Sequence, residues 1–377
     1  MLLEKTLERI QPLDRSFEAE VQQRLDSLTK PQRSLGKLED LARRVAVIQG
    51  KVPPRLGRKM LFVFAADHGI TAEGVSAYPK DVTAQMTYNF LRGGAAINVL
   101  ARHYGVEVEV IDVGVDYEFA NPAGLRNCKV RRGTDNFSRG PAMSRAEAVQ
   151  SIEAGIRLVE EVALENLFLL GAGEMGIGNT SSAAAMLCAF SGAAPRDVVG
   201  RGTGIDDPTW RRKVSAIERG LEINRPDPKE PLDVLTKVGG LEIGAMTGVI
   251  LSAAAFHIPM VLDGFISGAA ALLAQRLCPP IQDFLFASHL SPETGHKFMR
   301  RLNREHKLTI VAALHDLNLA ALFFPRLVML RDGKVYRDGL PKEVLTEKTI
   351  EEVYGIRVRV EPDPSGEKPQ LFICLSP

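Results

Sequence analysis

Cysteine is scarce in this sequence, and its scarcity excludes two classes of small domain. The 377 residues include four cysteines, and no two of them stand in a CxxC spacing. They are Cys128, Cys188, Cys278 and Cys374. Disulfide frameworks and structural zinc sites both need closely spaced cysteines. The sequence therefore predicts no metal site and is typical of a reducing compartment, the cytoplasm.

An excess of charge of one sign is also missing. Lysine and arginine number 47 and aspartate and glutamate 46, so the formal net charge is +1. Binding to nucleic acid, or to an anionic membrane surface, usually depends on a large basic excess. We therefore expect no nucleic-acid partner.

Long apolar runs are lacking as well. The N-terminus, MLLEKTLERIQPLDRS, carries charges throughout and has no apolar signal core. The longest apolar stretch, MTGVILSAAAFHIPMVL, contains His257 and Pro259. It indicates a buried helix followed by a buried strand, so we expect no membrane span.

The sequence does contain an alternation of helical and strand patterns. The first fifty residues have a helical pattern, and a long helical stretch is predicted from about Val82 to Arg102. Five apolar runs have strand length: 60–66, 106–114, 166–171, 258–264 and 283–291. An apolar stripe in the first fifty residues is formed by Leu35, Leu38, Leu41, Val45 and Ile48. The β-α-β order predicts an α/β fold with a parallel sheet.

Polar residues end each strand-length run. They are Asp67-His68, Asp112, Glu174, Asp263 and Ser288-His289. In an open parallel sheet these positions lie at the carboxyl edge, where ligands bind. We expect the functional site at this edge.

The segment GAGEMGIGNTSSAAA (171–185) resembles a phosphate-binding P-loop but has Asn179 where the lysine belongs. A glycine turn before a helix can still bind one phosphate through backbone N–H groups. Glu174 lies inside the predicted turn, and a carboxylate beside a phosphate needs another task, such as orienting a sugar hydroxyl or a heterocycle. The alternative interpretation is a tight turn whose glycines serve packing alone.

A second glycine-rich segment, GRGTGIDDPTWRRK (200–213), strengthens the phosphate hypothesis. It ends in Arg211, Arg212 and Lys213, and one of these cations could supply the charge that the first turn lacks. The alternative is a solvated basic face of a helix.

Eight segments together resemble one enzyme family. They are LTKPQRSLGKLEDLA, AADHGITAEGVSAYPKDVTAQM, FLRGGAAINVLA, GAGEMGIGNTSSAAA, GRGTGIDD, GGLEIGAMTG, LDGFISGAAALLA and FASHLSPETGH. Residues 1–298 resemble the nicotinate-nucleotide–dimethylbenzimidazole phosphoribosyltransferases, which act in lower-ligand synthesis of cobalamin. Arg33 departs from the family, which usually has glycine there.

The resemblance implies a fold, a reaction and an assembly. The fold is a Rossmann-like parallel sheet with flanking helices and a small helical domain, in a homodimer. The reaction moves the phosphoribosyl group of nicotinate mononucleotide to 5,6-dimethylbenzimidazole, without a cofactor or metal. The implied parts of the chain are 1–58 (helical part of the small domain), 59–298 (Rossmann-like domain) and 299–377 (a short α/β tail).

The resemblance also implies the residues of the site. Glu174 is the acidic, catalytic residue. The residues implied to bind phosphate and nucleotide are Gly176, Gly178, Asn179, Thr180, Gly202, Thr203, Lys213 and Ser291. Those implied to bind benzimidazole are Gln85, Met86 and Tyr78.

The tail resembles a different protein. After Gly295-His296 the sequence is similar to the C-terminal end of ABC-transporter ATPase subunits, with His315 at the switch-histidine position. The chain has neither a Walker A lysine nor an LSGG signature, so we expect no independent ATPase activity. The transferase family's C-terminal glutamate base is missing here, which predicts slow turnover, with Glu174 or Glu293 as a partial substitute. The alternatives are a non-catalytic binder of either substrate and a remnant partner of an ABC importer.

Overall fold

The computed structural model describes most of the chain. The residues it describes are 1–120, 122–202, 204–288, 321, 327–331, 334–355, 358–362 and 369–373. The chain divides into two compact units, Met1–Ile310 and Val311–Pro377, and each is described by itself.

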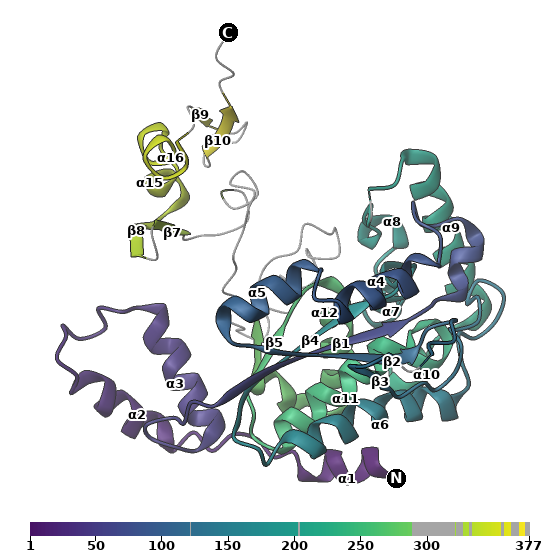
Figure 1. Ribbon diagram of the computed structural model, residues 1–377, viewed down its shortest axis with the longest axis horizontal. Helices are drawn as coiled ribbons and strands as arrows, with labels where there is room; N and C mark the ends of the chain where they lie inside the picture. The colour runs from purple at the N-terminus through teal and green to yellow at the C-terminus, as the bar shows by residue number, and fades with distance from the viewer. Residues whose placement is uncertain are drawn as a thin grey trace. The chain divides into compact units, whose positions relative to one another are not determined.

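The first unit is built on a six-stranded sheet in the order β3-β2-β1-β4-β5-β6 (Figure 1). Every pair of neighbouring strands is parallel. The strands are β1 (Arg58–Ala66), β2 (Glu107–Gly114), β3 (Leu125–Asn127), β4 (Leu167–Met175), β5 (Met260–Leu262) and β6 (Leu285–Ala287). The predicted α/β fold with a parallel sheet is therefore confirmed, and the short strand β3 is an addition to the prediction.

Helices cover both faces of this sheet (Figure 1). On one face α11 contacts β1, β2, β4 and β5, and α6 packs on α11. α12 also packs on α11 and contacts β4 and β5, while on the other face α4 contacts β1, β2 and β4. The α-helices of this unit are α1 (Leu2–Arg9), α2 (Phe17–Asp26), α3 (Lys37–Gln49), α4 (Val82–Leu91), α5 (Ala96–Tyr104), α6 (Arg145–Val162), α7 (Asn179–Ser191), α8 (Pro195–Val198), α9 (Asp207–Asn224), α10 (Pro231–Val238), α11 (Leu241–Ala255) and α12 (Phe265–Leu277). Two 3-10 helices complete the set, η1 (Gly69–Glu73) and η2 (Pro279–Phe284).

Two glycines allow α6 and α11 to pack very closely. A Cβ atom added at Gly155 of α6 would lie 1.9 Å from the Ala245 carbonyl oxygen, and one at Gly248 of α11 would lie 1.9 Å from the Ile152 carbonyl oxygen. Any side chain at these positions would push the helices apart. The helical layer on this face of the sheet depends on them.

The prediction of one long helical stretch from about Val82 to Arg102 is wrong. The chain forms α4 and α5 with a break between them, where Gly93 has a φ of +74°. The Arg102 guanidinium donates a hydrogen bond to the Gly93 carbonyl oxygen at 3.2 Å. The left-handed glycine interrupts the helix despite the continuous apolar pattern.

The N-terminal stripe is only partly buried. Ile48 is fully buried, whereas Leu38 is 63% exposed. Leu35 is 51% exposed and lies before the start of α3. The reason is that α2 and α3 pack mainly on each other, while α1 packs on α6 and α11 of the main body. Arg33 has a φ of +59°, the left-handed region that the family's usual glycine adopts easily.

The second unit is small. Its described elements are β7 (Leu327–Arg331), β8 (Lys334–Gly339), α15 (Pro341–Val344), α16 (Glu347–Tyr354), β9 (Val358–Pro362) and β10 (Pro369–Ile373). The sequence predicts a hairpin around Asp332-Gly333, and β7 and β8 form its antiparallel pair, with Arg331 opposite Lys334. The two turn residues, and a further strand that the apolar run 307–314 predicts, lie outside the described residues. No helix in the described part of the chain is long and apolar enough to cross a membrane.

Candidate active site at the carboxyl edge of the sheet

The site lies where the chain changes direction across the sheet. From β1 the chain continues to β2 and β3 on one side, and β4, β5 and β6 extend the sheet on the other. The carboxyl ends of β1 and β4 flank this reversal, which is the usual place for a ligand in open parallel sheets. Asp67 and His68 follow β1, and Glu174 lies near the end of β4. The expectation of a shared edge is confirmed for the described residues.

The glycine turn is shorter than predicted. Glu174 belongs to β4, opposite Phe64 of β1, and not to the turn. The segment stays extended because it pairs with β1 on one side and β5 on the other. The turn itself is Gly176–Gly178, closed by a hydrogen bond from the Asn179 N–H to the Gly176 carbonyl oxygen at 3.1 Å.

Both glycines of this turn have a steric reason. A Cβ atom at Gly176 would lie 2.4 Å from the Ala66 carbonyl oxygen. Gly178 has a φ of +99° and is the N-cap residue of α7. The turn thus leads directly into a helix N-terminus, where N–H groups lack intrahelical partners and the helix dipole favours an anion.

The second glycine segment meets the first through Lys213. This lysine of α9 is 1% exposed, and its Nζ donates a hydrogen bond to Thr180 Oγ1 at 2.8 Å. Gly202 lies against the same pair, because a Cβ atom there would be 3.4 Å from Lys213 Nζ. The structure therefore brings Thr180, Gly202 and Lys213 together beside the start of α7.

Glu174 is held by the first residue of α7. The Asn179 Nδ2 group donates a hydrogen bond to Glu174 Oε2. Burial of the carboxyl group, followed by the charges of Glu242 and Asp263, raises its pKa to about 8, although Asn179 and His68 oppose the shift. At neutral pH most of the Glu174 side chains are therefore protonated.

A buried group beneath the turn was missed by the sequence-based site prediction. His68 contacts Ser182 Oγ through Nδ1 at 3.0 Å and Glu242 Oε1 through Nε2 at 2.8 Å. The side chains of His68 and Glu242 are fully buried. One signal was available: Glu242 is the only charged residue in the apolar helix LEIGAMTGVILSAAA, and a buried charge needs a partner.

Thr83 connects α4 to the turn, and Asp67 connects the end of β1 to the loop after β2. Asp67 Oδ2 accepts a hydrogen bond from the Asp116 N–H at 2.8 Å, and Thr83 Oγ1 accepts one from the Ile177 N–H at 3.2 Å. Burial raises the pKa of Asp67. The Thr83 contact thus fixes the turn to α4.

The residues expected to bind benzimidazole lie on or near α4. Gln85 is exposed and Met86 half-buried on this helix, while Tyr78 is 54% exposed in the loop before it. Five residues singled out from the sequence lie outside the described residues, namely Thr203, His289, Ser291, Glu293 and His315.

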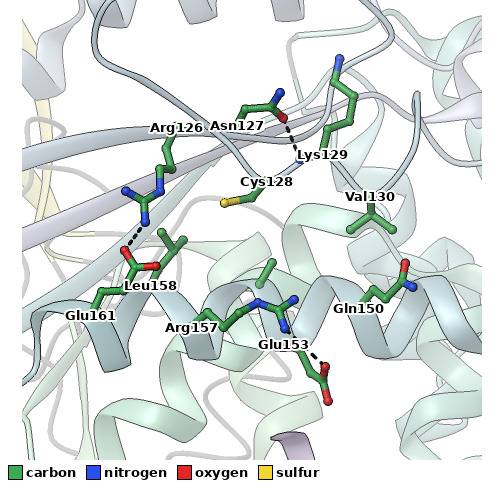
Figure 2. Close-up of a pocket in the computed structure, with 11 residues that line it drawn as sticks. Arg126, Asn127, Cys128, Lys129, Val130, Gln150, Glu153, Arg157, Leu158 and Glu161 are labelled. Atoms are coloured by element: carbon green, nitrogen blue, oxygen red, sulfur yellow. Dashed lines mark hydrogen bonds and ion pairs between the residues drawn. The ribbon is translucent and has the colours of Figure 1, made fainter. Parts of the chain in front are cut away.

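A separate cavity of about 640 Å³ lies between β3 and α6 (Figure 2). Each of the charged side chains that line it is ion-paired: Arg126 with Glu161, Arg157 with Glu153, and Lys129 with Asp112. None of the predicted site residues lines it. Its described walls therefore offer a ligand no charge that is not already neutralised.

Many α/β enzymes bind a phosphate at a helix N-terminus, so this geometry by itself does not specify the class of enzyme. Comparison with protein families does. The model of a family described as phosphoribosyltransferase matches residues 10–327. The chain is thus a phosphoribosyltransferase, and so a pentosyltransferase.

Individual relatives specify the family. The nicotinate-nucleotide–dimethylbenzimidazole phosphoribosyltransferase of Geobacter metallireducens is 51% identical over 322 residues, which are 85% of this chain and 91% of that protein. The enzyme of the same name from Geobacter sulfurreducens is 55% identical over 298 residues, 79% of this chain and 85% of that protein. The crystal structure of the enzyme of this name from Thermus thermophilus has a TM-score of 0.74 at 46% identity, covering 80% of this chain and 89% of that one. The chain belongs to this phosphoribosyltransferase family.

The family match extends beyond residues 1–298, the part of the sequence that carries the resemblance. It runs to residue 327, beyond residue 298. The comparisons support the transferase family, and they do not support the resemblance of the tail to a transporter ATPase.

Proposed function

We propose that this chain transfers the phosphoribosyl group of nicotinate mononucleotide to 5,6-dimethylbenzimidazole. The products are α-ribazole 5′-phosphate and nicotinate, and the reaction serves cobalamin lower-ligand synthesis in the cytoplasm. The names of the relatives support the two substrates. The observation that carries the proposal for this chain is the buried Lys213 beside the Gly176–Gly178 turn.

The phosphate of the nucleotide sits at the start of α7. The helix N-terminus and the turn provide backbone N–H donors, and Lys213 provides the positive charge that a P-loop takes from its own lysine. Thr180 positions the Lys213 ammonium group through the hydrogen bond at 2.8 Å. Of the remaining residues carried over from the family, Gly202, Thr203 and Ser291 complete the phosphate site, and Gln85, Met86 and Tyr78 form the benzimidazole site.

The chemistry needs a base and no acid. A benzimidazole nitrogen attacks the anomeric carbon, and the bond to the nicotinate ring nitrogen breaks with its electron pair. The ring nitrogen of nicotinate is positively charged in the nucleotide and leaves neutral, so it requires no proton. The benzimidazole N–H proton must leave, and a carboxylate accepts it.

Glu174 is the carboxylate proposed for this step in the absence of the family's C-terminal glutamate. A pKa of about 8 means that it is available as a base in only a minority of molecules at pH 7. Turnover is therefore slow compared with the relatives. Glu293 is the second candidate.

A turnover assay with nicotinate mononucleotide and dimethylbenzimidazole tests the function. Formation of α-ribazole 5′-phosphate at a measurable rate supports it. Isothermal titration should detect nucleotide binding without magnesium. Binding of the nucleotide with no product would favour the non-catalytic binder, and preferential binding of ATP to the same turn would contradict the monophosphate site.

The assembly is proposed to be a homodimer. The support on the chain itself is the set of leucines left on the surface of one copy, Leu35, Leu38 and Leu56, which are 51%, 63% and 75% exposed. Sedimentation equilibrium should give twice the mass of the chain.

A further inference from the structure

His68 lies at the centre of a buried group that joins three elements behind the phosphate turn. It follows β1, and its two ring nitrogens contact Ser182 in α7 and Glu242 in the first turn of α11. Ser182 is fully buried, as are the side chains of His68 and Glu242. The ring thus connects the starts of two helices.

The surroundings of His68 favour the charged ring. Burial by itself lowers the pKa of an imidazole, but the charge and hydrogen bond of Glu242, followed by the charges of Asp67 and of the ionised fraction of Glu174, outweigh it, so the pKa of His68 is raised. These three groups come from α11, the end of β1 and β4, and Ser182 of α7 is uncharged. An imidazolium has a donor on each nitrogen. It therefore donates to Glu242 Oε1 and to Ser182 Oγ at the same time.

The ring lies directly against the backbone of the turn. A Cβ atom at Gly176 would lie 3.4 Å from His68 Cδ2 and Nε2, and one at Gly178 would lie 3.2 Å from His68 Cβ. A Cβ atom at Gly240, just before α11, would lie 2.5 Å from His68 Cε1. A side chain at Gly240 would therefore clash with the ring, and the turn at Gly176 and Gly178 lies in close van der Waals contact with His68.

We propose that His68 is a positioning residue for the phosphate of the nucleotide, acting as a buried imidazolium with Glu242 as its counter-ion. The ring fixes the Gly176–Gly178 turn to the first turn of α7 and places a positive charge behind the N–H groups that meet the anion. His68 does not touch substrate. The inference rests on the proposed function, because it assumes that a phosphate binds at this turn.

The central variant is Glu242→Gln, which keeps the shape of the side chain and removes the charge that stabilises the imidazolium. His68 should then lose its proton at a lower pH than in the unaltered chain. At neutral pH we expect the dissociation constant of nicotinate mononucleotide to rise about tenfold, on the scale of one charge-assisted hydrogen bond. The loss should disappear as the pH is lowered and His68 is protonated again.

Ser182→Ala is the matched variant. It removes the acceptor of the Nδ1–H group but leaves the imidazolium and Glu242 in place. Binding should weaken, with no shift in the pH at which it changes. A merely structural role would give the same pH profile for both variants.

The measurement combines titration and NMR. Calorimetric titration with nicotinate mononucleotide across a range of pH gives the affinity of each variant as a ratio to the unaltered chain, which cancels the ionisation of the phosphate itself. Nitrogen NMR of the histidine ring, assigned with His68→Asn, reports the protonation state without any ligand. A doubly protonated ring at neutral pH, together with a downward pH shift in Glu242→Gln, is the expected result.

Two results would overturn the inference: a neutral His68 ring at neutral pH in the unaltered chain, or nucleotide binding by Glu242→Gln equal to that of the unaltered chain at every pH. If the unaltered chain binds inorganic phosphate but no nicotinate mononucleotide, the proposed function fails instead. The same variants titrated with inorganic phosphate then decide the role of His68.

Discussion

At the scale of single residues, two consecutive positions at the start of α7 separate the positive and negative groups of the site. Asn179 donates to Glu174, and Thr180 accepts from Lys213. The acidic group and the basic group thus have neighbouring but different partners. In the function we propose, a phosphate approaches the lysine while the glutamate faces the heterocycle or the ribose.

Replacement of Lys213 by alanine should weaken nucleotide binding far more than benzimidazole binding. A charge-assisted hydrogen bond contributes roughly 1.5–3 kcal/mol, so the dissociation constant of the nucleotide should rise about tenfold to a hundredfold. Titration calorimetry with each substrate measures the difference. Arg211→Ala, an exposed cation on the same helix, is the control and should bind the nucleotide normally. An unchanged nucleotide affinity in Lys213→Ala would exclude its role as countercharge.

Glu174 should make the rate depend on pH. Burial, Glu242 and Asp263 raise its pKa to about 8, so its basic form increases as the pH rises through that value. We expect kcat to increase between about pH 7 and pH 9. Glu174→Gln should flatten this rise and lower kcat toward the lower end of the roughly 10²–10⁴-fold that general-base catalysis contributes. A rise of equal size in Glu174→Gln would assign the proton to another group, with Glu293 next in line.

At the scale of elements, the junction between β4 and α7 determines the site. The junction depends on Gly176, because the backbone of β1 comes so close that no side chain fits between it and the turn. The same close approach brings the end of β1, with Asp67 and His68, next to Glu174 of β4. A turn that is required for packing is therefore also the phosphate-binding feature that we propose, and the two interpretations left open by the sequence are compatible.

Gly176→Ala should damage the turn more than the fold. The added methyl group would lie 2.4 Å from the Ala66 carbonyl oxygen, which forces the backbone to shift. Overpacking of this kind costs about 1–3 kcal/mol, and the displaced N–H groups should weaken nucleotide binding about tenfold or more. Thermal unfolding and titration calorimetry measure the two effects. Gly140→Ala, where a Cβ atom meets nothing within 4 Å, is the control. Equal behaviour of the two variants would refute the steric argument.

At the scale of the whole molecule, the site and the C-terminal part of the chain belong to different units. The described site residues all lie in the unit Met1–Ile310, and the second unit, Val311–Pro377, has a small core of its own around Met329, Val344 and Ile350. The family match covers most of the first unit and ends at residue 327. Nucleotide binding and the contribution of a C-terminal base should therefore be separable.

Grafting the C-terminal segment of a relative after His296 tests this separation. The graft supplies the C-terminal glutamate base that the family resemblance implies, so under the proposed function kcat should rise by about 10²–10⁴-fold. The affinity for nicotinate mononucleotide should change little, because the phosphate turn and Lys213 are untouched. Steady-state kinetics and calorimetry on both chains provide the comparison. If the original chain already turns over as fast as the graft, the missing base does not limit it.

The sequence by itself determined the class of fold and most of the proposed phosphate site. Apolar runs of strand length separated by helical patterns specify a parallel sheet, because crossovers between parallel strands need a helix. Glycines before a helix N-terminus, with three cations in the next glycine segment, predicted a phosphate site, and the family resemblance then selected Gly176, Thr180 and Lys213. These signals are local, and the residues that carry them are close in sequence.

Only the tertiary structure decided the end of β4, the break at Gly93 and the grouping of His68 with Ser182 and Glu242. A glycine-rich segment remains a strand when β1 and β5 pair with it, and that pairing depends on residues far away in the chain. His68 and Glu242 are 174 positions apart, so neither spacing nor composition relates them. Their charges meet because the sheet brings the end of β1 against the start of α11, and burial then makes each the required partner of the other.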